Sequence, residues 1–172
     1  RRYLAFISIL VAICASLWIA PASAQVVTIQ ESTPGFCGLV GTVHSNHSGY
    51  TGSGFTNGNN AIARGVNWSV NVPAGGMYQL DWRFANATSD RPGSVKINRA
   101  TVTTLAFPST GAWSSWTTVS TTVSLNSGSN YIRLEATTSV GLANIDSLAV
   151  TGGSAVQVAA CDSGGDGSDG DY

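Results

Sequence analysis

The stretch VNWSVNVPAGGMYQLDWRFA (residues 66–85) alternates apolar and polar side chains in two runs, separated by a break that begins at Pro73. In the first run, Asn and Ser separate the apolar residues from Val66 to Val72, and in the second, polar residues alternate with apolar ones from Tyr78 to Phe84. Successive side chains of a β-strand point to opposite faces, so this period of two predicts two half-buried strands. The Pro and Gly residues between the runs predict the turn that joins them.

The rest of the chain from Val26 to Thr151 also has a β pattern. Further runs cover residues 95–97, 116–125, 131–136 and 145–150, and Gly, Pro and Asn stand between many of them. No window shows the 3.6-residue period of a helix at useful length. Short strands at regular spacing predict an all-β fold, an antiparallel β-sandwich of the jelly-roll, galactose-binding-like type.

The two ends of the chain differ from this central part. Residues 1–24 begin with two arginines, continue as an apolar run and end in Ala22-Ser-Ala24, which predicts a secretory signal peptide, with a transmembrane anchor as the alternative. Residues 25–161 are expected to form the sandwich domain. Residues 162–172 contain mainly Gly, Ser and Asp, so we expect a flexible linker that leads to a further domain.

Cysteine and charge content narrow the class of protein. Two cysteines follow the predicted signal peptide, Cys37 and Cys161, and we expect them to form a disulfide in a secreted, extracellular protein. Residues 25–161 hold six basic and five acidic side chains with no basic run. This balance argues against a nucleic-acid partner, and no membrane contact is expected once the signal peptide is cleaved.

The segment GAWSSWTTV (residues 111–119) holds two tryptophans, one on each side of a predicted strand start. Residues three apart on a strand fall on opposite faces, so we expect Trp116 in the core and Trp113 at the rim. The alternative is that both indoles are buried. An exposed indole at the rim of a polar β domain offers a flat surface on which the C–H face of a sugar stacks.

Polar and aromatic residues in two other segments fit the same chemistry. Tyr50 lies in the glycine-rich loop 46–55, and Asn144 directly precedes the last long strand. If the sandwich brings these loops together with Trp113, they supply two aromatic surfaces and an amide for sugar hydroxyls. Tyr50 taken alone fits a packing role equally well.

Catalysis has less support. The five acids of residues 25–161 form no close pair in sequence, although glycoside hydrolysis needs only spatial pairing. His44 and His47 share one loop, but a single H-x-x-H without further ligands is weak evidence for zinc. A small secreted lyase or hydrolase, or a structural or adhesive β module, remain the alternatives to a binding module.

Several segments in order carry a family resemblance: Ile29-Gln-Glu31, GYTGSGF (49–55), residues 66–86, residues 110–119 and NIDSLAV (144–150). This set resembles carbohydrate-binding module family 35 and its relative family 6, which are β-sandwich modules attached to secreted polysaccharide-degrading enzymes. The cysteine soon after the first segment is similar to modules attached to pectate lyases. The resemblance implies a non-catalytic module, tethered to a catalytic domain.

The resemblance also implies site residues. A sugar would contact Tyr50, Trp113 and Asn144, and a structural calcium ion would be held by Gln30 or Glu31 together with Asp146. Family members that bind uronic acids add a calcium ion beside the sugar carboxylate. The alternative for Asp146 is a buried, hydrogen-bonded acid without a metal.

The junction RFANATSDRP (residues 83–92) adds Arg83 and Asn86 as candidate sugar contacts. An arginine there would pair with a uronate carboxylate, although a surface ion pair with Asp90 fits equally well. We therefore expect a monomeric module that binds plant cell-wall polysaccharide, with uronic-acid-containing pectin or xylan favoured, and that targets an attached catalytic domain.

Overall fold

A computed structural model describes residues 24–161, and within this range the chain forms strands, turns and loops without a helix. The strands are β1 (Gln25–Gln30), β2 (Phe36–Leu39), β3 (Gly41–His44), β4 (Phe55–Gly58), β5 (Gly65–Val72), β6 (Gly76–Ala85), β7 (Gly93–Ile97), β8 (Ala100–Leu105), β9 (Trp116–Leu125), β10 (Gly128–Ala136), β11 (Asn144–Gly152) and β12 (Gln157–Val158). The predicted signal peptide, except Ala24, and the predicted linker lie outside the described residues. No helix that could span a membrane is found among residues 24–161.

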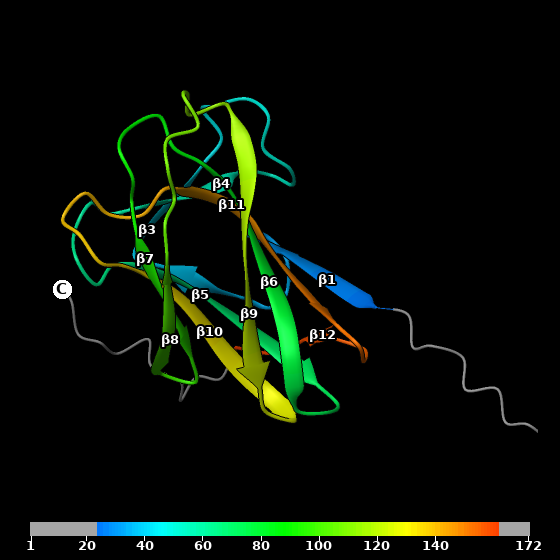
Figure 1. Cartoon of the computed structure of the whole chain (residues 1–172). Helices are drawn as coiled ribbons and strands as arrows, with labels where there is room; N and C mark the ends of the chain where they lie inside the picture. The colour runs from blue at the N-terminus through cyan, green and yellow to red at the C-terminus, as the bar shows by residue number, and fades with distance from the viewer. Residues whose placement is uncertain (1–23, 162–172) are drawn as a thin grey trace, which may run out of the picture.

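Two antiparallel sheets form the sandwich (Figure 1). The first sheet has the order β3-β4-β11-β6-β9, and β1 also pairs with β11. The second sheet has the order β12-β5-β10-β7-β8, and β2 pairs with β5. The predicted fold class is therefore confirmed.

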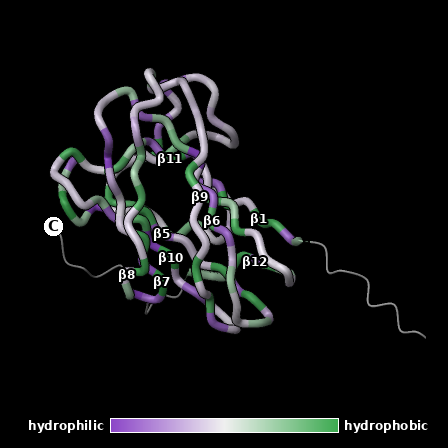
Figure 2. The backbone as a smooth tube through the Cα atoms, viewed as in Figure 1, coloured by the Kyte–Doolittle hydropathy of each residue, from purple (hydrophilic) through white to green (hydrophobic). Residues whose placement is uncertain are grey.

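The core lies between the two sheets and contains the alternating residues of β5 and β6. The side chains of Trp68 and Trp82 are almost completely buried, and their rings meet edge to face with centroids 6.4 Å apart. The polar residues that alternate with the apolar ones in β5 and β6 point away from the core. Figure 2 shows polar and apolar segments interspersed along the strands. Burial of these large apolar surfaces is the main force that holds the sheets together.

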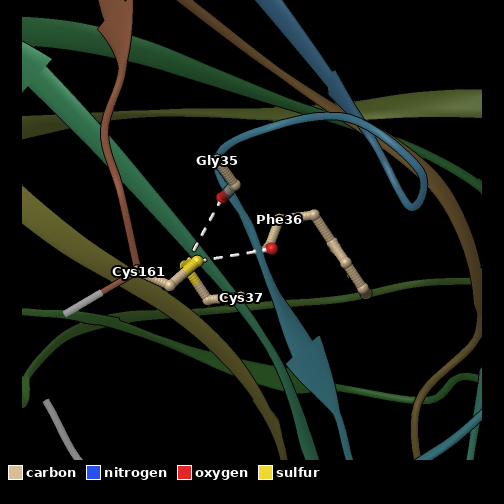
Figure 3. Close-up of a disulfide and its surroundings, with 4 residues drawn as sticks. All are labelled: Gly35, Phe36, Cys37 and Cys161. Atoms are coloured by element: carbon tan, nitrogen blue, oxygen red, sulfur yellow. Dashed lines mark hydrogen bonds between the residues drawn. A yellow bond between two sulfur atoms is a disulfide. The ribbon is translucent and has the colours of Figure 1, made fainter. Parts of the chain in front are cut away.

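The predicted disulfide is present between Cys37 in β2 and Cys161 after β12 (Figure 3). The two Cα atoms lie 5.4 Å apart and the cysteines are separated by 124 residues along the chain. Because the bond closes a long loop in the unfolded chain, its entropic stabilisation of the fold is roughly 5 kcal/mol.

An ion-pair network lies on the outer face of the second sheet. Glu135 in β10 accepts a hydrogen bond from Nε of Arg133 and pairs with Lys96 of β7 at 2.5 Å. Burial raises the pKa of Glu135, but the hydrogen bonds and charges of Lys96 and Arg133 outweigh it and hold the pKa below its ordinary value.

Candidate functional site

A pocket of about 250 Å³ opens where several loops converge at one end of the sandwich. The loops that follow β3 and β6 and the loop that precedes β9 lie near the top of Figure 1, and the loop between β4 and β5 lies at its left. Four separate segments and the first residue of β11 contribute to the lining, which consists of His47, Asn57, Asn60, Arg91, Trp113 and Asn144. The side chains offer amides, one imidazole, one indole and one guanidinium, and no described Asp or Glu is among them.

Trp113 and Asn144, which were predicted as sugar contacts, line the same pocket. Asn144 begins β11, where its pairing with Ala85 of β6 places it at this end of the first sheet. Trp113 precedes β9, and its side chain is half-buried at the pocket wall. An amide fixed by a sheet and an indole on a loop thus face one cavity.

A stack of rings connects the pocket to the loop between β3 and β4. The ring of His47 lies nearly parallel to that of Trp113, with centroids 6.4 Å apart and planes 23° apart. The ring of His47 also stacks on that of Phe55, with centroids 5.8 Å apart and planes 26° apart. Phe55 is fully buried, so it supports the position of His47.

The histidines do not form a metal centre with one another. The Nε2 atom of His44 lies 2.7 Å from the hydroxyl of Thr42, and its Nδ1 atom lies 3.3 Å from the side-chain amide of Asn57. Among residues 24–161, no group of three His, Cys, Asp or Glu side chains is arranged to hold a metal ion.

Arg91 is the cation of the pocket. Its Nη1 atom donates to the Asn60 side chain at 3.0 Å and to the carbonyl oxygens of Val140 and Leu142, and the guanidinium lies 5.3 Å from the centroid of the Trp113 ring. Burial lowers the pKa of Arg91, yet an arginine stays protonated at neutral pH. No Asp or Glu in the described part of the chain pairs with it, so its charge is uncompensated.

Arg83, the other arginine of this region, lies outside the pocket. Its Nη1 atom donates to Asp146 at 2.6 Å and its Nη2 atom donates to the carbonyl oxygen of Gly49 at 2.8 Å. The guanidinium also lies 5.3 Å from the centroid of the Trp116 ring. Arg83 therefore holds protein groups together on the outer face of the first sheet.

The predicted contacts Asn86 and Tyr50 are not in the pocket lining either. Asn86 is completely buried, and its amide nitrogen donates to the carbonyl oxygens of Ser89 and Phe107 at 2.8 Å each. It therefore shapes the loop that carries Arg91 and presents no surface to a ligand. Tyr50 is half-buried, with its ring 5.9 Å from that of Phe55.

Trp116 differs from our expectation. It begins β9, but it faces away from the residues of β9 that enter the core, such as Val123 and Leu125. Core-facing residues of a strand are an even number of positions apart, whereas Trp116 is an odd number of positions from Val123 and Leu125. Trp116 therefore falls on the outer face of the sheet. There its ring packs on Phe55 at 5.4 Å and remains half-buried.

Oxygen atoms gather beside the loop that contains Thr51 and Ser53. Both carboxylate oxygens of Asp146 accept hydrogen bonds from Thr51, at 2.8 and 2.7 Å, and one oxygen of Glu31 accepts two from Ser53. The remaining oxygen of Glu31, Oε2, and the Oε1 atom of Gln30 are buried without a hydrogen-bond partner. Buried, unpartnered oxygens of this kind suit a hard cation such as calcium.

Sequence reasoning missed the pocket roles of His47, Asn57 and Asn60, and it did not distinguish Arg91 from Arg83 as the arginine of segment 83–92 that lines the pocket. The clustering of Asn residues in NGNN (57–60) and the second arginine of the segment 83–92 were the available signals. Neither shows by itself which loop side chains face inward.

Several known proteins are similar to this chain. The model of the family "Carbohydrate binding module (family 6)" matches residues 36–152. The CBM35 from Cellvibrio japonicus Abf62 is 42% identical with a TM-score of 0.78, covering 80% of this chain and 99% of that one. The structure of Xyl-CBM35 in complex with a glucuronic acid-containing disaccharide is 43% identical with a TM-score of 0.76, covering 78% and 99%.

Longer proteins also match. Endo-1,4-beta-xylanase B and alpha-L-arabinofuranosidase C, both of Cellvibrio japonicus (strain Ueda107), are each 45% identical over 128 residues, which is 73% of this chain. The chain spans about a fifth of the length of these curated relatives, since the match covers 21% of each.

Proposed function

The chain belongs to carbohydrate-binding module family 35, a relative of family 6, and we propose that its pocket binds a uronic-acid-containing saccharide of plant cell-wall xylan or pectin. Modules of this family are non-catalytic. The pocket lining offers amides, an imidazole, an indole and a guanidinium for contacts with a ligand.

The uncompensated charge of Arg91 is the observation that carries this proposal. A partly buried guanidinium without a carboxylate partner favours an anion, and a hydrogen bond between a guanidinium and a carboxylate is stronger than one between neutral groups. Its Nη2 atom takes part in no hydrogen bond within residues 24–161, so a donor remains for a ligand. A sugar carboxylate supplies the missing negative charge.

The other lining residues fit a sugar ring. Trp113 offers an apolar surface for C–H groups, and the amides of Asn57, Asn60 and Asn144 offer donors and acceptors for hydroxyls. Tyr50, which lies outside the pocket lining, would contact a neighbouring sugar unit of the polysaccharide. A relative, Xyl-CBM35, has been solved with a glucuronic acid-containing disaccharide, which supports the same class of ligand here.

Isothermal titration of the chain with three probes tests the proposal: a glucuronic acid-containing xylo-oligosaccharide, an oligogalacturonide and a neutral xylo-oligosaccharide. We expect an acidic probe to bind at least tenfold more tightly than the neutral one. Arg91→Gln should remove this preference, because a charge-assisted hydrogen bond contributes about 1.5–3 kcal/mol. Arg99→Gln, at the turn between β7 and β8, is the control. Equal affinity for acidic and neutral probes would refute the uronate assignment.

We also propose a structural calcium ion at Gln30 and Glu31, with Asp146 beside them. The two buried, unpartnered oxygens of Gln30 and Glu31 support this site. Asp146 fits less well, because its Oδ2 atom already faces the guanidinium of Arg83 at 2.6 Å. Bound calcium would neutralise Glu31 and tie β1 to the loop through Ser53.

Thermal melts with calcium and with a chelator test this second proposal. Calcium should raise the melting temperature of the wild type, because an ion that binds only the folded state stabilises it by mass action. Glu31→Gln should reduce the shift. A melting temperature that does not respond to either addition would count against the site.

The cellular role follows from tethering. The disulfide is consistent with secretion, and the curated relatives are larger enzymes. We propose that the module is a secreted, monomeric unit that raises the local polysaccharide concentration around an attached catalytic domain. Deleting the module from the full-length protein should lower activity on insoluble polysaccharide and spare activity on soluble oligosaccharides. An equal effect on both substrates would contradict targeting.

A further inference from the structure

We propose that Trp116 and Arg83 are positioning residues of the saccharide pocket, because together they hold the loop of residues 45–54 against the first sheet. This inference rests on the proposed function, since it concerns how the pocket is prepared for a sugar. The loop carries His47 into the pocket lining, whereas Trp116 and Arg83 do not line the pocket.

Two hydrogen bonds fix adjacent backbone carbonyls of the loop. The Nε1 atom of Trp116 donates to the oxygen of Ser48 at 2.9 Å, and the Nη2 atom of Arg83 donates to the oxygen of Gly49 at 2.8 Å. The guanidinium and the indole also contact each other, with 5.3 Å between Cζ and the ring centroid. The two side chains therefore act on one point of the loop.

The loop backbone lies directly on the indole at this point. A Cβ atom placed on Gly49 would come within 3.0 Å of the Cδ1 atom of Trp116, and the φ angle of Gly49 is +88°. Both features favour glycine, since an added Cβ would press on the indole and a side chain would be strained at this φ. Such close contact is expected of a clamp and not of a loosely covering loop.

A continuous series of ring contacts leads from this clamp to the pocket. Trp116 packs on Phe55 at 5.4 Å, Phe55 on His47 at 5.8 Å, and His47 on Trp113 at 6.4 Å. Phe55 is fully buried but lies outside the cluster of core residues between the sheets. These rings form a separate aromatic cluster whose position depends on the loop.

Loss of the clamp would weaken binding without unfolding the sandwich. A loop that is mobile in the free protein must be ordered when the sugar binds, and this ordering reduces the affinity. A hydrogen bond of ordinary strength corresponds to an effect of about three- to tenfold on the dissociation constant.

Trp116→Phe tests the proposal, because it keeps a smaller ring beside Phe55 and removes the N–H group that donates to the carbonyl oxygen of Ser48. We expect about three- to tenfold weaker binding of the acidic xylo-oligosaccharide. We also expect faster hydrogen exchange of backbone amides confined to residues 45–54 in the sugar-free protein. Arg83→Lys keeps the charge beside Asp146 but offers fewer donors, so it should also weaken binding and speed the exchange of residues 45–54. This second variant tests the proposal if Trp116→Phe does not fold.

Lys96→Met is the matched control. Like Arg83, Lys96 is a partly exposed cation paired with a carboxylate, with 27% of its side chain exposed against 31%, but it lies on the second sheet. Lys96→Met should change neither the affinity for the sugar nor the hydrogen exchange of residues 45–54.

Unchanged loop exchange in both Trp116→Phe and Arg83→Lys would overturn the clamp, and so would unchanged affinity for the sugar in both variants. Absence of sugar binding by the wild type would instead overturn the proposed function, and loop exchange would still decide whether the clamp exists.

Discussion

Replacing Trp113 by alanine separates binding from folding more cleanly than other changes in the pocket. The indole lines the pocket and lies outside the core cluster. Its described ring contacts are the His47 imidazole at 6.4 Å and the Arg91 guanidinium at 5.3 Å. The substitution thus removes the largest apolar surface offered to a sugar and leaves the two sheets intact.

The expected magnitudes differ for binding and for stability. Truncating an aromatic anchor at the centre of a binding site costs about 2 kcal/mol or more, which corresponds to roughly a 30-fold weaker affinity. For stability, an exposed cation–π contact and a ring pair contribute about 0.5–1 kcal/mol each. Partial loss of these contacts should lower the melting temperature by only about 3–5 °C.

Affinity electrophoresis in soluble glucuronoxylan and differential scanning calorimetry measure the two effects on one preparation. Trp113→Phe, which keeps a smaller ring, should retain part of the binding. Undiminished retention of a folded Trp113→Ala variant in the gel would refute the assignment of this pocket. A fall of 15 °C or more would show that the indole supports the fold, which contradicts its place outside the core.

Three further predictions concern stability. Replacing Cys37 and Cys161 together by serine should lower the free energy of unfolding by roughly 3–5 kcal/mol, measured by urea denaturation with and without reductant, and equal stability of the wild type in both conditions would contradict this. The pKa of Glu135 is lower in the folded state, so its contribution to stability is present at neutral pH and is lost as the pH falls through its folded pKa. Urea melts of wild type and Glu135→Gln should therefore differ less at pH 3 than at pH 7, and an equal difference at both pH values would contradict this. Gly49→Ala should lower the melting temperature more than Gly128→Ala, because both glycines have a positive φ but only Gly49 faces the Trp116 ring.

Several long strands were predictable because their apolar residues alternate with polar ones. In β5, β6 and β10 the apolar residues recur at every second position, which is visible without any knowledge of neighbours. In β11 a register shift between Ile145 and Ser147 interrupts this alternation. The short strands β3, β4 and β12 show no such alternation, since their burial depends on which strand lies beside them. Only pairing with β4 identifies β3 as a strand.

The site was predictable in part. Trp113 and Asn144 combine a local sequence signal with a position at a strand end, and both line the pocket. Arg83 lies near the end of β6 and Arg91 in the loop that follows it, and they differ little as sequence signals. The path of that loop brings Arg91 into the pocket, whereas Arg83 stays on the sheet. The prediction for Trp116 was wrong. An odd number of positions separates it from Val123 and Leu125, which face the core, and this spacing was already visible in the sequence.

The amino-acid sequence by itself determined the β class, the alternation that creates two buried sheet faces and the pairing of two distant cysteines, because each depends on local period or on residue count. The tertiary structure alone decided which loop side chains share a cavity, since those residues come from segments up to about a hundred positions apart. It also decided that the charge of Arg91 stays uncompensated while that of Arg83 is neutralised by Asp146, because a charge balance depends on distances that a linear sequence does not contain.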